Sequence, residues 1–177
     1  KVQRYVDAAD KYKGDFAVIV DGDDILWSWE YVDKSIERAE KTVADVIFCR
    51  GLPLGMAPSG LRVSAIKKVC EMKDEPDTEV WGGYFTKPGI FNVEYIDASN
   101  NETDDARMTL DYPEDFEFFR RIITQMSSKD ILSLKKIIQF LKTHPEIKKI
   151  NSIAQKKYED HISKAAPLRF KNILAKK

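Results

Sequence analysis

The segment FAVIVDGDDILWSWEYV, residues 16–32, decides the fold that we expect. It begins with five apolar residues, three of them β-branched, a pattern typical of a strand that is buried on both faces. Asp21, Asp23 and Asp24 follow this strand directly. Because open α/β sheets bind ligands at the carboxyl ends of their strands, these three carboxylates are our first candidates for a functional site.

The pattern around this segment alternates between helices and strands. Residues 2–12 and 28–43 carry apolar side chains at helical spacing, and residues 45–49, DVIFC, form a second apolar run. Helix, strand, helix and strand in this order predict an α/β fold with a mostly parallel central sheet. Residues 50–60, RGLPLGMAPSG, are rich in glycine and proline, so we expect a loop there.

The second half of the chain is predicted to end in a helical part. We expect a helix over 64–72, strands over 90–96 and 107–110, and a helix over 113–126 that begins at Pro113, where proline is well tolerated. Beyond residue 127 the pattern is helical throughout. We therefore divide the chain into the remainder of an α/β domain, residues 1–127, and a helical carboxyl-terminal extension, residues 128–177.

Composition is ordinary for a globular protein. The 177 residues are 43% hydrophobic and 33% charged, enough for one domain with a core. No apolar run approaches the roughly 20 residues of a membrane helix, and no secretory signal is visible. Cys49 and Cys70 lie in apolar surroundings without the spacing of metal ligands. We therefore expect reduced thiols in a cytoplasmic protein.

Charge is distributed unevenly along the chain. Residues 128–177 contain 13 Lys and Arg against 4 Asp and Glu, while residues 1–127 contain 16 against 25. The lysines of the tail are spaced as solvated helix faces and lack the interleaved aromatic residues of a nucleic-acid groove, so we expect no nucleic-acid partner. The apolar run IIQFL, residues 137–141, either supports a homodimer or packs on its own domain.

An aspartate from a second segment of the chain extends the candidate site. Asp111 follows the predicted strand 107–110 and precedes the helix at Pro113, so its carboxylate also projects from the carboxyl edge of a strand. Mg²⁺ prefers oxygen ligands and is commonly held by one or two carboxylates together with substrate phosphates. Two aspartates at one edge could therefore clamp one ion. The alternative for residues 21–24 is an Asp-rich turn without a metal.

Two signatures carry a resemblance to a known family. Residues 14–37 resemble the segment of sugar-activating cytidylyltransferases in which a strand, a Gly-Asp pair and a helix beginning Glu-Tyr-Val-Asp follow one another. Residues 106–119, ARMTLDYPEDFEFF, are similar to their second signature, Arg-x-Thr-x-Asp-x-Pro-Glu-Asp. Residues 129–151 resemble the helical tail of the spore-coat polysaccharide biosynthesis (SpsF-like) branch, which is grouped with the CMP-Kdo and CMP-acylneuraminate synthetases.

The resemblance implies a nucleotidyltransferase with a GT-A-like α/β fold, and it assigns roles to individual residues. The aspartates that hold Mg²⁺ and are catalytic in the family match Asp23 and Asp111, while Asp21 and Asp24 are a further ligand or outer acceptors. The positions that match the substrate-binding segments are Pro53, Gly55, Glu79, Trp81, Tyr84 and Arg107. For the aromatic residues among them, packing in the core is the alternative, and for Glu79 it is a solvated surface position.

The implied reaction transfers CMP from CTP to an acidic sugar of the ulosonic or nonulosonic acid type and releases pyrophosphate, for polysaccharide biosynthesis. The glycine-, arginine- and lysine-bearing loop that opens the nucleotide site in the family has no counterpart here, so we expect that it precedes this sequence. Two alternatives stay open. Asp21-Gly22-Asp23 is an Asp-x-Asp motif of metal-dependent GT-A glycosyltransferases, and an incomplete domain could bind a sugar or a partner without catalysis.

Overall fold

A mixed four-stranded sheet forms the centre of the α/β part. The structure is a computed structural model and describes residues 1–75, 81–126, 132–164 and 167–171. Within these ranges the strands are β1 (Phe16–Ile19), β2 (Val46–Arg50), β3 (Ser59–Arg62) and β4 (Val93–Asp97), in the spatial order β1-β3-β2-β4. Strand β3 pairs antiparallel with both β1 and β2, whereas β2 pairs parallel with β4.

The expectation of a mostly parallel sheet is therefore wrong, and β3 is the reason. This strand begins at Ser59, inside the glycine- and proline-rich segment that we expected to be a loop. Only eight residues separate the end of β2 at Arg50 from Ser59. A parallel crossover needs a dozen residues or more, so the chain can only turn back and pair antiparallel.

The mixed sheet still gathers three carboxyl ends at one edge. Strands β1 and β2 run in the same direction because both are antiparallel to β3, and β4 is parallel to β2. The loops that follow β1 and β2 therefore leave the sheet on the same side. The four residues of β1 are all partly exposed, because this strand lies at the edge of the described sheet rather than buried on both faces as expected.

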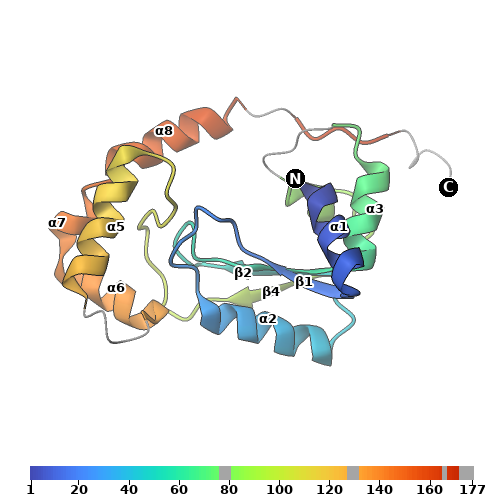
Figure 1. Ribbon diagram of the computed structural model, residues 1–177, viewed down its shortest axis with the longest axis horizontal. Helices are drawn as coiled ribbons and strands as arrows, with labels where there is room; N and C mark the ends of the chain where they lie inside the picture. The colour runs from blue at the N-terminus through green and yellow to red at the C-terminus, as the bar shows by residue number, and fades with distance from the viewer. Residues whose placement is uncertain (76–80, 127–131, 165–166, 172–177) are drawn as a thin grey trace.

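Helices cover both faces of the sheet (Figure 1). Helices α1 (Val2–Tyr12) and α3 (Val63–Met72) lie on one face, and α2 (Trp29–Lys41) lies on the other. These helices and the strand 93–97 confirm the sequence predictions to within three residues at each end. The predicted strand 107–110, which lies within the described residues, does not form there; Arg107 makes an isolated bridge with Leu54 instead.

A group of helices lies to one side of the sheet (Figure 1). This helical part, as we use the name from here on, consists of α5 (Pro113–Gln125) from the predicted α/β domain together with α6 (Leu134–Thr143), α7 (Pro145–Lys148) and α8 (Ser152–Ile162). One core cluster joins α5 and α6 to α2 and β2, through side chains that include Phe118, Ile137, Tyr31 and Ile47. Ile137, Ile138 and Leu141 of the apolar run are buried in this cluster, so that face of α6 packs on its own chain. The predicted boundary after residue 127 falls outside the described residues and stays a prediction.

Among the described residues, the helices are too short or too polar for any of them to cross a membrane.

Candidate functional site

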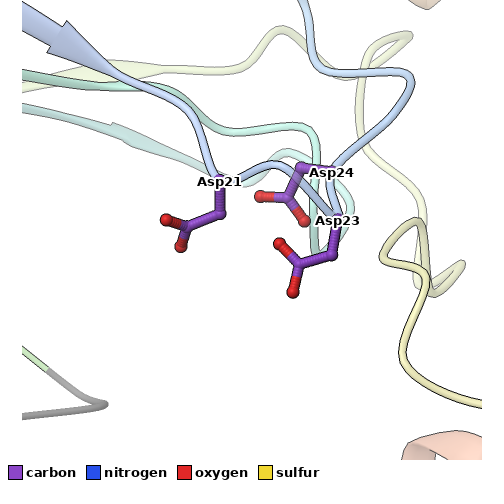
Figure 2. A group of neighbouring side chains, drawn as sticks. All are labelled: Asp21, Asp23 and Asp24. Atoms are coloured by element: carbon purple, nitrogen blue, oxygen red, sulfur yellow. The ribbon is translucent and has the colours of Figure 1, made fainter. Parts of the chain in front are cut away.

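Three carboxylates meet in the loop after β1. One oxygen each from Asp21, Asp23 and Asp24 lies within 4.8 Å of the others. Figure 2 shows the three side chains pointing to the same side of this loop. The backbone N–H of Asp24 donates to the carbonyl of Asp21 at 3.1 Å, so a tight turn holds the cluster together. The donor set is thus made of carboxylate oxygens, the ligand type that a small hard cation prefers.

Asp111 joins this cluster in one cavity of about 180 Å³. The backbone N–H of Leu110 donates to the carbonyl of Asp23 at 2.9 Å, which fixes the two segments side by side. The structure therefore brings Asp23 and Asp111, the two predicted metal ligands, to the same place, although their roles stay a prediction. The cavity is lined by Lys1, Asp21, Asp23, Asp24, Leu54, Gly55, Thr109, Asp111, Tyr158 and Ile162.

The cavity concentrates negative charge. Burial raises the pKa of Asp24 to about 6, a hydrogen bond with Thr109 opposes this rise, and the charges of Asp23, Asp21 and Asp111 add to it. Burial also raises the pKa of Asp111, against the opposing effect of Arg107. A bound divalent cation would relieve this repulsion and favour the ionised carboxylates, so the residues present fit Mg²⁺.

Arg107 supports Asp111 from outside the cavity. Its guanidinium donates from Nη2 to Asp111 Oδ2 and from Nε to Asp115 Oδ1, the latter at 3.0 Å. Arg107 is 3% exposed and does not line the carboxylate cavity. The structure thus gives this arginine ion pairs with two aspartates, and its predicted contact with substrate stays untested.

The loop after β2 closes another side of the cavity. The Pro53 carbonyl accepts a hydrogen bond from the Met56 N–H at 3.0 Å, which makes a turn, and the Leu54 carbonyl accepts from the Met108 N–H at 2.7 Å. Gly55 within this turn has φ of +87°. A Cβ at Gly55 would lie 2.5 Å from the Met108 carbonyl carbon and 2.8 Å from the Thr109 nitrogen. Glycine is therefore required both for the backbone conformation and for the close approach to the segment that carries Asp111.

Gly55→Ala is expected to destabilise the fold by about 2 kcal/mol or more, because the side chain meets backbone atoms and the positive φ is strained. Urea unfolding of the variant checks this loss. Gly22→Ala is the matched control, since a Cβ at Gly22 meets nothing within 4 Å. Equal stability of the two variants would show that the loop can move away from Met108 at little cost.

The aromatic candidates lie elsewhere. Trp81 is 9% exposed and packs edge-on against Tyr5 and Phe85, with ring centroids 6.0 and 5.8 Å away. Tyr84 is fully buried, and its hydroxyl accepts a hydrogen bond from the Arg169 N–H at 3.2 Å. Both side chains belong to the core cluster under α1 and α3. This placement matches core packing, the alternative to substrate binding for these aromatic residues. Glu79 lies outside the described residues.

Sequence reasoning did not select three residues that surround the site. Asp115 is fully buried and accepts hydrogen bonds from the backbone N–H groups of Asp111 and Tyr112 at 3.1 and 3.0 Å. Its position in the first turn of α5 is a capping signal that could have indicated this role. Asn151 and Tyr158 belong to the helical part, and nothing in their local pattern points to the cavity.

These observations define a class: a mixed α/β protein with a carboxylate-lined cavity between the carboxyl edge of its sheet and an added group of helices. The chain is similar to the solved structure of a cytidylyltransferase from Leptospira borgpetersenii serovar Hardjo-bovis, with a TM-score of 0.73 and 23% sequence identity. The match covers 82% of this chain and 63% of that chain, so our sequence spans less than two thirds of the solved protein. At this identity the likeness shows the fold.

A curated relative gives the second comparison. Uncharacterized protein MJ1063 of Methanocaldococcus jannaschii is 28% identical over 163 residues, which are 90% of this chain and 67% of the relative. No family model matches the sequence. The likeness to the solved structure therefore supports a cytidylyltransferase-like fold.

Proposed function

We propose that this chain is the metal- and sugar-facing part of a nucleotidyltransferase that transfers CMP from CTP to an acidic sugar and releases pyrophosphate. The observation that carries the proposal is the single cavity that contains both Asp23 and Asp111. The likeness of the fold to a cytidylyltransferase and the resemblance of residues 14–37 and 106–119 to the two signatures support it. The ulosonic or nonulosonic acid substrate, the role in polysaccharide biosynthesis and the cytoplasmic location are parts of the same proposal.

In the proposed reaction a sugar hydroxyl oxygen attacks the α-phosphorus of CTP. The new phosphorus–oxygen bond forms as the bond to pyrophosphate breaks, and the hydroxyl proton passes to water. Asp23 and Asp111 would hold Mg²⁺, which supplies positive charge next to the phosphate oxygens when it is bound. Arg107 and Asp115 keep Asp111 in place, and the turn at Gly55 fixes the opposite wall, so the chain contributes mainly positioning.

The experiment that tests the proposal uses the full native polypeptide that contains this sequence. We expect pyrophosphate release with CTP, Mg²⁺ and one member of a panel of ulosonic and nonulosonic acids, and no release when the sugar or the metal is omitted. Asp23→Ala in the same polypeptide is expected to abolish the release. Silence across the panel, together with undetectable binding of CTP, would contradict the proposal and favour a non-catalytic binding domain.

A metal-dependent glycosyltransferase is the second candidate, because the two aspartates of the Asp-x-Asp motif, Asp21 and Asp23, have oxygens in the same cluster. The products separate the two reactions. Nucleotidyl transfer releases pyrophosphate, whereas glycosyl transfer from a sugar nucleotide releases a nucleotide without consuming CTP. Release of a nucleoside diphosphate from a sugar nucleotide, with no pyrophosphate from CTP, would replace our proposal by this alternative.

A further inference from the structure

Asn151 has an unusual role for a residue at the start of a helix. It is the N-cap residue of α8, but its side chain makes no capping hydrogen bond to that helix. Its amide nitrogen donates instead to Asp115 Oδ1 at 2.9 Å and to the Arg107 carbonyl at 3.0 Å. Asn151 is 1% exposed, so both hydrogen bonds are shielded from water. The side chain of Asn151 therefore satisfies acceptors in another part of the chain instead of capping its own helix.

Those acceptors lead directly to Asp111. Asp115 Oδ2 accepts from the backbone N–H of Asp111 at 3.1 Å, and Asp115 Oδ1 accepts from Arg107 Nε at 3.0 Å. Arg107 Nη2 in turn donates to the Asp111 carboxylate. Asp115 therefore holds Asp111 twice, once through its backbone and once through the arginine. Asn151 donates hydrogen bonds to both Asp115 and Arg107, the two residues that hold Asp111.

Helix α8 also reaches the cavity itself. The ring of Tyr158, two turns along α8 from Asn151, lies 4.9 Å from the Arg107 guanidinium carbon. Tyr158 and Ile162 both line the cavity that contains Asp23 and Asp111. The helical part of the chain is thus a wall of the site as well as a neighbour of it.

We propose that Asn151 is a positioning residue for Asp111, and that α8 thereby sets the metal affinity of the cavity. The inference rests on the proposed function, which makes Asp111 a metal ligand. Without the amide of Asn151, Asp115 Oδ1 loses one of two donors and the Arg107 carbonyl loses a buried partner. The arginine and the Asp115 carboxylate then gain freedom to move, and Asp111 is no longer held at one orientation. Partners behind a ligand commonly change metal affinity by about 10- to 100-fold.

The test measures Mn²⁺ binding to the full native polypeptide by electron paramagnetic resonance, at a temperature where every variant is folded. We expect Asn151→Ala to weaken Mn²⁺ binding by about 10-fold or more. Asn151→Ser is the second variant and is used if alanine prevents folding, because serine, like asparagine, is a preferred N-cap residue. Ser152→Ala is the matched control, since Ser152 is exposed and its hydroxyl donates to the Lys149 carbonyl, outside this arrangement.

A double-variant comparison separates positioning from a merely structural role. We expect the effect of Asn151→Ser on the Mn²⁺ dissociation constant to disappear in an Asp111→Asn background and to persist in an Asp21→Asn background. A structural role would lower the melting temperature and leave the Mn²⁺ affinity of the folded protein unchanged. If the wild-type protein binds Mn²⁺ and both Asn151 variants bind it with the same affinity, the inference is overturned while the proposed function stands. Failure of the wild-type protein to bind Mn²⁺ overturns the proposed function and the inference with it.

Discussion

Asp111→Asn is expected to lower pyrophosphate release from CTP by a factor of about 10³ while the protein stays folded. Asparagine has the shape of aspartate and can still accept a hydrogen bond from Arg107, but it carries no negative charge for a metal. The Asp111 side chain is 32% exposed at the cavity, so the fold does not depend on its burial. The change removes charge at the proposed site without creating a gap in the core.

The same variant has a second readout that needs no substrate. Burial is the main cause that raises the pKa of Asp24 to about 6, and the charge of Asp111 adds to this rise. Removing that charge is expected to bring the pKa of Asp24 closer to its ordinary value, which nuclear magnetic resonance titration of the carboxyl carbon can follow. A pKa unchanged by the substitution would show that Asp111 lies too far from Asp24 to share a cation with it.

Turnover and thermal unfolding of Asp111→Asn should be compared with those of Asp33→Asn. Asp33 is exposed on α2 and does not line the cavity, so the same chemical change there should leave turnover at the wild-type level. Wild-type turnover in Asp111→Asn would remove this residue from the catalytic centre. Equal losses in both variants would point to a general effect of lost charge on the protein.

The carboxylate cluster could be predicted from the sequence because it depends on local pattern. An apolar run followed by Asp21, Gly22 and Asp23 specifies a strand end and a turn wherever that strand lies in the sheet. Asp111 was predictable for a similar reason, since Pro113 marks the start of the next helix. The strand expected before Asp111 did not form, yet backbone hydrogen bonds from Leu110 to Asp23 and from Met108 to Leu54 bring this segment to the cavity.

The remainder of the fold and site depends on partners far apart in the sequence. Strand β3 has the sequence Ser-Gly-Leu-Arg, with no β-branched residue, and only its register between β1 and β2 makes it a strand. Asn151 lies 36 residues from Asp115, and its own surroundings predict only a helical segment. The burial of Tyr84 likewise involves a partner far along the chain, Phe170, whose ring centroid lies 5.2 Å away.

Asp115→Asn is expected to cost about 3–5 kcal/mol of stability, the largest loss that we expect from a single substitution in this chain. Asp115 is fully buried and accepts four hydrogen bonds, from Arg107, Asn151 and the backbone N–H groups of Asp111 and Tyr112. The asparagine side chain has only one acceptor oxygen. Its NH₂ group would therefore face the N–H donors that now bond to the other carboxylate oxygen of Asp115. Arg107 would also lose a carboxylate partner while it stays buried.

Glu114→Gln is the matched control for this prediction. Glu114 precedes Asp115 in the first turn of α5, so both side chains interact favourably with the helix dipole, but Glu114 is partly exposed and pairs with Lys157 at 2.6 Å. We expect a much smaller loss there in urea unfolding. If the cost at Asp115 comes from a buried guanidinium that has lost one of its two carboxylate partners, Arg107→Met combined with Asp115→Asn should recover part of the lost stability. Similar losses at positions 114 and 115 would instead mean that the helix dipole, and not the buried network behind Asp111, determines the stability of this end of α5.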